Sequence, residues 1–355
     1  MNQFYLSSLL AVFVLALIAW LGALGLPWLF GIVLPYLAVL IFIVGVVRRI
    51  VGWSRSPVPF AIPTTAGQQK TMPWIQQAKI DNPSTTIGVV ARMALEILTF
   101  RSLFRNTRMK MNGEEGRISY HLEVFLWLFA LAFHYAFLTT LVRHLRFFLE
   151  PVPWCIQMLG TLDGFMKIEI LYNPIQVGLP GVYLSGIVLL AAVIFLFLRR
   201  LFVANVRYIS LASDYFPLFL IMGIAFTGIL MRYFIKADVA AIKELTMGLV
   251  TFSPSVPAGI SPLFYIHLFF VCVLLAYFPY SKLMHMGGIF LSPTRNMRTN
   301  TREARHVNPW NYPVKVHTYE AYEDEFREKM VEAGLPVEKM PAPAEAAATE
   351  EEEKE

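Results

Sequence analysis

The sequence predicts an all-α fold, a polytopic bundle of about six transmembrane helices with a cytoplasmic loop and tail. Composition is the first indication, because 56% of the residues are hydrophobic and only 15% are charged. Soluble domains carry roughly a quarter charged residues. The second indication is that the apolar residues cluster in runs that can cross a bilayer, which takes about 20 helical residues. The third is that basic residues gather between these runs, as membrane orientation requires.

The apolar runs cover approximately 4–25, 29–52, 122–148, 180–203, 209–233 and 262–286. The first run has neither the basic start nor the cleavage site of a signal peptide, so we expect it to be retained. The short breaker Gly25-Leu26-Pro27-Trp28 then predicts a helical hairpin. We expect a hairpin at 1–54, a loop at 55–120, a four-helix core at 121–290 and a tail at 291–355, which is disordered from about 341.

Lys and Arg predict the orientation of the chain in the membrane. They are abundant after the second, fourth and sixth runs, whereas the other two loops are nearly charge-balanced. The positive-inside rule therefore predicts a multi-pass protein of the cytoplasmic (inner) membrane with both termini in the cytoplasm. This arrangement also accounts for the net charge of +5 without a nucleic-acid partner.

The first cytoplasmic loop contains a stretch with helical periodicity. From Thr86 to Arg105, apolar residues recur at helical spacing, and charged residues such as Arg92 and Glu96 lie between them. The pattern predicts an amphipathic helix that lies on the membrane surface or under a partner protein. An ordinary solvated helix packed on its own loop is the alternative.

Histidines inside the predicted spans are the main functional candidates. His134 and His144 lie in the third run, and His267 and His285 lie in the sixth. An ionisable side chain within hydrocarbon is costly and therefore marks a functional site. Imidazole is a natural axial ligand of heme iron, and a helix bundle can enclose the macrocycle. The alternative is a set of buried histidines that are hydrogen-bonded within the bundle.

Helix rise predicts how these histidines pair. His144 and His267 each lie about five residues, or roughly 8 Å, from the outer ends of two antiparallel helices, so they can share one iron. His134 and His285 would hold a second iron nearer the cytoplasm.

The inner pair fits less well than the outer pair. The two histidines of the third run are about 15 Å apart along their helix, and those of the sixth run are about 27 Å apart. A bend at Pro279 can absorb the difference. On depth alone, His121 is a rival to His134.

Basic residues near the span ends are candidates to pair with heme propionates. Each can equally be a snorkelling or orientation residue. They are Arg143, Arg146 and Arg232 near the outer surface, and Arg117, Arg199, Arg200, Arg207 and Lys282 near the inner one. Two cysteines are too few for a protein-bound iron–sulfur cluster, and no C-x-x-C-H motif for covalent heme attachment is present.

The histidine spacing resembles that of the gamma subunit of respiratory nitrate reductase, over roughly residues 30–290. Two further motifs share this resemblance: Pro279-Tyr280-Ser281-Lys282-Leu283-Met284-His285, and Arg199-Arg200 with Arg207, Ser210 and Asp214. The loop is similar to one branch, the cytochrome b (M) subunit of the Dsr membrane complex associated with dissimilatory sulfite reductase. The similar segments are Ile62 to Lys70, Pro73-Trp74-Ile75, Asp81-Asn82-Pro83 and Phe100 to Asn106.

The resemblance implies a diheme b cytochrome subunit with two non-covalent hemes b, each held by one histidine from each helix. It also implies electron transfer between menaquinol and a cytoplasmic iron–sulfur subunit related to heterodisulfide reductase, in a respiratory complex of sulfur or sulfite metabolism. Further implied partners are a multiheme cytochrome c, a ferredoxin-like subunit and a second membrane subunit. Arg143 stands where nitrate reductase has a Gly, which leaves the quinone pocket unassigned.

Other functions remain open from the sequence. The chain could be a gamma-type cytochrome b subunit of another respiratory reductase, acting on nitrate or heterodisulfide. It could also be a structural anchor, or a transporter that relays protons through histidines. Such transporters often show inverted repeats and broken half-helices, which the sequence does not display.

Overall fold

The computed structural model describes residues 4–56, 58, 61–62, 67–112, 117–165, 168–172, 175–179, 182–299 and 316–339. Only the backbone is described at 108, 110–112, 117–118, 165, 168–172 and 175–179. The chain divides into two units, Met1–His306 and Val307–Glu355, which we describe separately. The tail expected to be disordered from about 341 lies outside the described residues.

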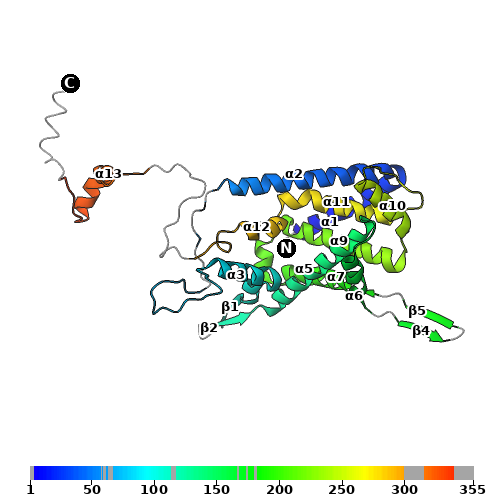
Figure 1. Cartoon of the computed structure of the whole chain (residues 1–355), viewed down its shortest axis with the longest axis horizontal. Coiled ribbons are helices and arrows are strands. Elements are labelled where there is room, and N and C mark those ends of the chain that lie inside the picture. Colours follow the sequence, from blue (N-terminus) through cyan, green and yellow to red (C-terminus); the bar gives the residue numbers. More distant parts are fainter. Residues whose placement is uncertain are drawn as a thin grey trace, which may run out of the picture. The chain divides into compact units, whose positions relative to one another are not determined.

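Six helices within the described ranges are long and apolar enough to cross a membrane (Figure 1). They agree with the predicted runs to within a few residues, which confirms the polytopic all-α fold. A helix satisfies its own backbone hydrogen bonds, as the bilayer interior requires. The spans are α1 (Phe4–Gly25), a π-helical turn (Leu29–Val33) continuing into α2 (Leu34–Ser54), α5 (Val124–His144) with the 3-10 turn Leu145–Phe147, α7 (Leu184–Phe202), α9 (Ala212–Ile229) with the π turn Leu230–Phe234, and α11 (Pro262–Tyr277) with the 3-10 turn Phe278–Tyr280.

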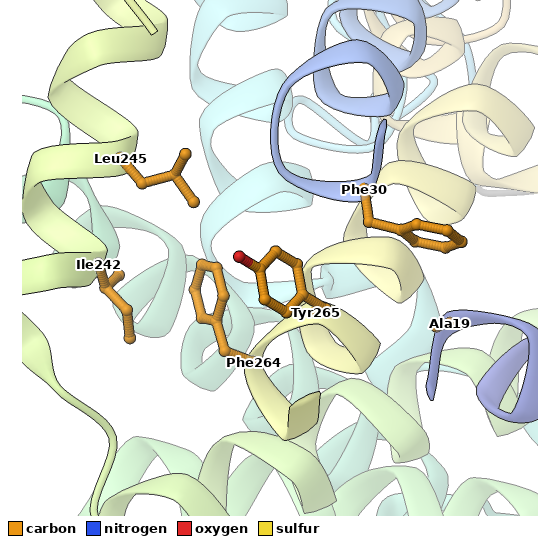
Figure 2. Packing of buried hydrophobic residues seen from close by; sticks show 6 residues of the cluster. All are labelled: Ala19, Phe30, Ile242, Leu245, Phe264 and Tyr265. Atoms are coloured by element: carbon orange, nitrogen blue, oxygen red, sulfur yellow. The ribbon is translucent and has the colours of Figure 1, made fainter. Parts of the chain in front are cut away.

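Buried apolar side chains join these helices in three clusters. One joins α5, α7 and α9 through residues such as Ala136, Val193 and Ile221. Another joins α1, α9 and α11. The third, shown in Figure 2, packs α10 (Val239–Val250) against the first turn of α11 and consists of Ala19, Phe30, Ile242, Leu245, Phe264 and Tyr265. This third cluster fixes the part of α11 that carries His267.

The sixth span is interrupted at Pro279. The α-helix ends at Tyr277, two 3-10 turns follow at Phe278–Tyr280 and Lys282–Met284, and α12 (His285–Leu291) begins at the histidine itself. Proline lacks the N–H that an α-helix needs, so the predicted bend is realised as a break. On α2, a Cβ at Gly45 would lie 2.6 Å from Pro279 Cβ, so glycine lets the two segments approach.

The first loop folds into two helices and a hairpin. They are α3 (Thr86–Thr99), α4 (Arg101–Phe104), β1 (Thr107–Asn112) and antiparallel β2 (Arg117–Leu122). The helix predicted over 86–105 is confirmed but divided at Phe100, whose φ of 49° is left-handed. The segment after α12 packs on this loop, because the Thr299 N–H donates to the Pro83 carbonyl at 2.8 Å.

Several short elements on the opposite side were not predicted from the sequence. They are α6 (Trp154–Asp163), α10, and the two-stranded hairpins β3 (Gly164–Phe165) with β6 (Val182–Tyr183) and β4 (Ile168–Tyr172) with β5 (Ile175–Leu179). A further short helix, α8 (Ala204–Ile209), connects α7 to α9.

The second unit contains the charged helix α13 (Tyr319–Glu332). Its first turn is capped by Thr318, whose hydroxyl accepts the Ala321 N–H at 3.2 Å. The Glu323 carboxylate accepts the N–H groups of Glu338 and Lys339 at 2.9 Å, which folds the following segment back onto the helix.

Candidate functional site

The four histidines that were predicted to lie in the spans meet in two pairs, although His285 follows the sixth span at the start of α12. The ring centroids of His144 and His267 are 6.4 Å apart and their planes differ by 18°. Those of His134 and His285 are 5.9 Å apart with planes at 81°. His121, the rival for the inner position, is exposed on strand β2 opposite Arg108. The ring next to His285 is therefore that of His134.

Each of the four rings has a hydrogen-bond partner at Nδ1. His134 lies 2.7 Å from the Ala130 carbonyl, His144 lies 2.6 Å from the Thr140 carbonyl, and His285 lies 2.8 Å from the Lys282 carbonyl. A carbonyl only accepts, so Nδ1 carries the proton in these three rings. The remaining nitrogen, Nε2, is then a lone-pair donor, which is the state that a metal requires.

His267 is the member of the set whose partner is a side chain. Its Nδ1 lies 2.9 Å from Thr227 Oγ1 on α9, and that hydroxyl also lies 2.8 Å from the Gly223 carbonyl. The carbonyl takes the hydroxyl proton, so the hydroxyl oxygen can accept the Nδ1 proton of His267. The same tautomer is thereby favoured in all four rings.

The spacing within each pair fits one iron between two imidazoles. A metal-bound imidazole nitrogen lies about 2 Å from the metal, and the ring centroid lies about 1 Å further, so two such rings have centroids roughly 6 Å apart. Both measured separations agree with this value. Next to the outer pair, Gly228 packs close to the His267 ring, since a Cβ at this position would be in van der Waals contact with it at 3.4 Å.

A buried ion pair lies immediately beside the outer histidines. Arg143 Nε lies 3.0 Å from Asp163 Oδ2, and the two side chains are 10% and 6% exposed. The Asp163 carboxylate also accepts the N–H and the hydroxyl of Ser185, at 2.8 and 2.6 Å. The Thr140 hydroxyl donates to that of Ser185 at 3.1 Å, so α5, α6 and α7 are joined one turn from His144.

A pocket of about 630 Å³ opens next to this ion pair. Three arginines surround one aromatic ring there: Arg143 and Arg232 stack over Tyr183 at 3.7 and 4.9 Å, and Arg146 donates to its hydroxyl at 3.5 Å. The pocket therefore combines cationic hydrogen-bond donors with an aromatic wall. Its lining residues are Arg143, Arg146, Val152, Ile156, Gln157, Gly160, Thr161, Gly164, Tyr183 and Arg232.

The inner pair is bordered by aromatic rings and by the loop that precedes α5. Phe100 and Phe133 contact His134 edge-on, with centroids 4.8 and 5.1 Å away. The backbone just before Phe100 is fixed to α5, because the indole N–H of Trp127 donates to the Thr99 carbonyl at 2.7 Å. His285 is exposed, whereas His134 is half-buried.

The basic candidates near the inner pair already have protein partners. Lys282 Nζ lies 2.6 Å from Asp214 Oδ1, and Arg207 donates to the Leu201 carbonyl at 3.4 Å. Asp214 also accepts the Leu211 N–H and so caps α9. The first contact joins α9 to the 3-10 turn before His285, and the second joins α8 to the end of α7.

Sequence reasoning did not single out Asp163, Tyr183, Thr227, Gly228 or Phe100. Thr227 and Gly228 could have been noticed as a polar and a small residue within an apolar run. Asp163 and Phe100 carry no such signal, because their roles depend on contacts with other helices.

Sequence comparison adds the family. The profile described as "Nitrate reductase gamma subunit" matches residues 88–301. The chain belongs to the nitrate reductase gamma-subunit family. The part that matches this family contains all four paired histidines together with Arg143, Arg207 and Lys282, whereas α1 and α2 precede it.

Two archaeal relatives share most of the chain. A protein of Archaeoglobus fulgidus is 47% identical over 290 residues, which cover 80% of this chain and 83% of the relative. A protein of Archaeoglobus profundus is 42% identical over 286 residues, which cover 78% of this chain and 81% of the relative. Both are named "Hdr-like menaquinol oxidoreductase cytochrome b-like subunit". The membrane spans and the family together make this chain a multi-pass membrane protein.

Proposed function

We propose that the chain is a diheme b cytochrome subunit that passes electrons between menaquinol and a cytoplasmic iron–sulfur partner. The observation that supports the proposal is that the four histidines form two pairs, and that the spacing within each pair fits one iron. The hydrogen bonds at Nδ1 also leave Nε2 of these rings without a proton. The relatives named as menaquinol oxidoreductase subunits of the cytochrome b type support the same chemistry. When bound, heme b would supply one-electron transfer at each pair.

The protein's own contribution is to hold and orient the ligands. Hydrogen bonds at Nδ1 fix both the tautomer and the rotation of each imidazole, which strengthens a metal ligand. His134 and His144 are separated by about 15 Å of helix α5, so the two sites lie at different depths in the membrane. Such a separation suits electron transfer across the bilayer.

We place quinol oxidation in the pocket beside the outer pair. Arg143 and Arg146 provide donors for a quinone oxygen, and Tyr183 provides an aromatic wall for its ring. Asp163 holds Arg143 in place. These arginines could also pair with the propionates of the outer heme. Arg207 and Lys282 could pair with the propionates of the inner heme. With both termini in the cytoplasm, protons from the quinol would leave on the outer side.

The loop and the tail would then receive the iron–sulfur partner on the cytoplasmic side. The "Hdr-like" name of the relatives supports a partner related to heterodisulfide reductase. The sequence resemblance further favours the Dsr complex of sulfite metabolism, with its multiheme cytochrome c, ferredoxin-like and second membrane subunits.

Reduced-minus-oxidised spectra of the purified protein test the heme proposal. We expect b-type absorption bands and two hemes per chain. Replacing any one of His134, His144, His267 or His285 by Ala should remove about one heme and leave the other largely in place. The matched control is His121→Ala, which should retain both. Wild-type protein without b-type bands would contradict the proposal and favour a proton-relay transporter or an anchor.

The quinol pocket needs its own test, because hemes can bind without it. Arg143→Gln should slow reduction of the outer heme by a menaquinol analogue in liposomes while both hemes remain bound. Arg55→Gln, an exposed residue beyond the end of α2, is a control that should have no effect. Unchanged reduction in Arg143→Gln would exclude this pocket as the quinol site.

A further inference from the structure

Helix α3 exposes its apolar face and buries its charged one. Its buried residues are Val89, Arg92 and Glu96, and the two charged side chains belong to residues that are only 3% and 8% exposed. On the opposite face, Ile87 is 84% exposed and Val90 is 63% exposed. The amphipathic helix expected from the sequence is therefore present, but its faces are reversed relative to a helix on a soluble core.

The buried carboxylate of Glu96 is stabilised by the loop and by the segment after α12. Glu96 accepts the Ser102 N–H at 3.2 Å and also bonds the Ser102 hydroxyl, which caps α4. It lies 2.8 Å from Arg295, which follows α12. Burying a carboxylate is costly unless it is paired and hydrogen-bonded, and Glu96 is both. These contacts fix the orientation of α3 in the folded loop. Because the face with Glu96 is turned inward, the apolar face points outward.

The outward face forms one continuous stripe without charge. Its members follow the helical spacing i, i+3, i+4, i+7 and i+11: Ile87, Val90, Ala91, Ala94 and Leu98. Exposed apolar patches of this kind mark contact surfaces. A surface for a water-soluble partner would usually carry a polar rim with hydrogen-bonding side chains.

Contacts with α5 place this stripe beside the membrane span. The Leu98 carbonyl accepts the Tyr135 hydroxyl at 2.8 Å, and Phe104 packs against Trp127 with ring centroids 5.0 Å apart. Tyr135 is about 16 Å along α5 from its first residue, and its side chain leans back toward that end. The C-terminal turn of α3 therefore lies alongside the spanning part of α5.

The neighbouring surface of α5 is itself apolar and exposed. Phe125 is 71% exposed, Leu128 is 47% exposed and Leu138 is 55% exposed. In a multi-pass membrane protein, such side chains contact acyl chains. The stripe on α3 is likewise apolar and exposed, and it adjoins this lipid-facing surface of α5 at Leu98.

We infer that lipid acyl chains cover the exposed stripe of α3, so that this helix lies in the bilayer interface beside α5 and is not a docking site for a soluble subunit. The inference does not depend on heme or quinol chemistry. A cytoplasmic protein would then dock on the hairpin β1–β2 and on the tail.

Spin-label accessibility in the full-length protein tests this inference. Cys155→Ser removes the exposed native thiol, while Cys272 is buried. Single cysteines are then introduced at Ile87, Val90 or Leu98, spin-labelled, and the protein is reconstituted in phosphatidylcholine vesicles. We expect oxygen, which partitions into lipid, to relax these labels more strongly than a water-soluble nickel chelate does. Leu128→Cys on α5 is the lipid-facing control, and Lys79→Cys in the loop is the aqueous one.

Three outcomes decide the matter. Labels at Ile87 and Val90 that behave like the label at Leu128 support lipid contact. Labels that behave like the one at Lys79 overturn it, because the stripe would face water. Labels shielded from both reagents also overturn it, since they would show a protein surface on the stripe. Thermal unfolding in detergent at the wild-type temperature confirms that the bundle of each labelled variant is intact, and a failure of the heme proposal would not change the accessibilities.

Discussion

Replacing Thr227 by Val tests whether the Thr227 hydroxyl supports the outer heme. Valine has nearly the same shape as threonine, so the change removes the hydroxyl that lies 2.9 Å from His267 Nδ1 and leaves the packing intact. The other three Nδ1 atoms are paired with backbone carbonyls, which no substitution can remove. His267 is thus the ligand whose orientation can be perturbed without touching the ligand itself.

The size of the effect follows from what such partners contribute. Loss of a hydrogen-bond partner behind a metal ligand typically weakens binding by about 10- to 100-fold, or roughly 1.4–2.7 kcal/mol. Thr227 is buried in the bundle, so water cannot easily replace its hydroxyl, and we expect the upper half of that range. The inner heme should be unaffected, because Thr227 does not border His134 or His285.

Transfer of heme from the protein to an excess of apomyoglobin measures this directly. Thr227→Val should release its outer heme faster and more completely than the wild type, and Thr227→Ser, which keeps the hydroxyl, should resemble the wild type. Equal retention of both hemes in Thr227→Val would refute the reasoning. Equal loss of both hemes would do so as well, because it would indicate general destabilisation.

Three further predictions concern stability and pH. Asp163→Ala should lower the free energy of unfolding by about 3–5 kcal/mol, because Arg143 would stay buried without its carboxylate; thermal unfolding in detergent measures this, and the double variant Arg143→Leu with Asp163→Leu should recover much of the loss. Gly45→Val should cost about 1–3 kcal/mol, because its side chain would collide with Pro279; Gly52→Ala, where an added Cβ meets nothing within 4 Å, is the control and should be close to neutral in the same assay. Burial alone would raise the pKa of Asp81, but hydrogen bonds from Arg101 and Arg105 hold it below its usual range. Asp81 therefore stabilises the loop fully at pH values above the usual pKa of Asp, and this stabilisation is lost as the pH falls through the lower pKa of the folded protein. Proteolysis of the loop should increase at acidic pH in the wild type, and already at neutral pH in Asp81→Asn.

The transmembrane architecture could be predicted because span length and hydrophobicity are local properties of the sequence. The short outer elements α6 and α10 could not, since neither has a length or a charge pattern that separates it from a loop. The loop helix shows the limit clearly. Its spacing predicted an amphipathic helix, but periodicity does not say which face is buried. The Arg295 that stabilises Glu96 lies in a distant part of the sequence, after α12.

The candidate site was predictable to the extent that it follows from helix rise. Depth alone placed His144 beside His267. For the inner pair, the rise of an unbroken helix left a mismatch of roughly 12 Å. The break at Pro279 and the start of α12 at His285 alter that geometry, and the extent of such a break depends on packing against Gly45. Supporting residues such as Thr227 and Asp163 could not be predicted from the sequence, because each contacts a residue on another helix.

The division of each histidine pair between α5 and the last span has a consequence for biogenesis. While the chain is being synthesised, α5 is inserted long before α11 and α12, so a heme that arrives early can find a ligand on one side only. Both sites become complete only when the segment through His285 has reached the membrane. Capture of the two proposed hemes would then be a late step, and a truncated chain that ends before Pro262 should retain no bis-histidine heme although His134 and His144 are present. The low-spin spectrum of the protein would therefore report, in living cells, that the whole bundle has been inserted.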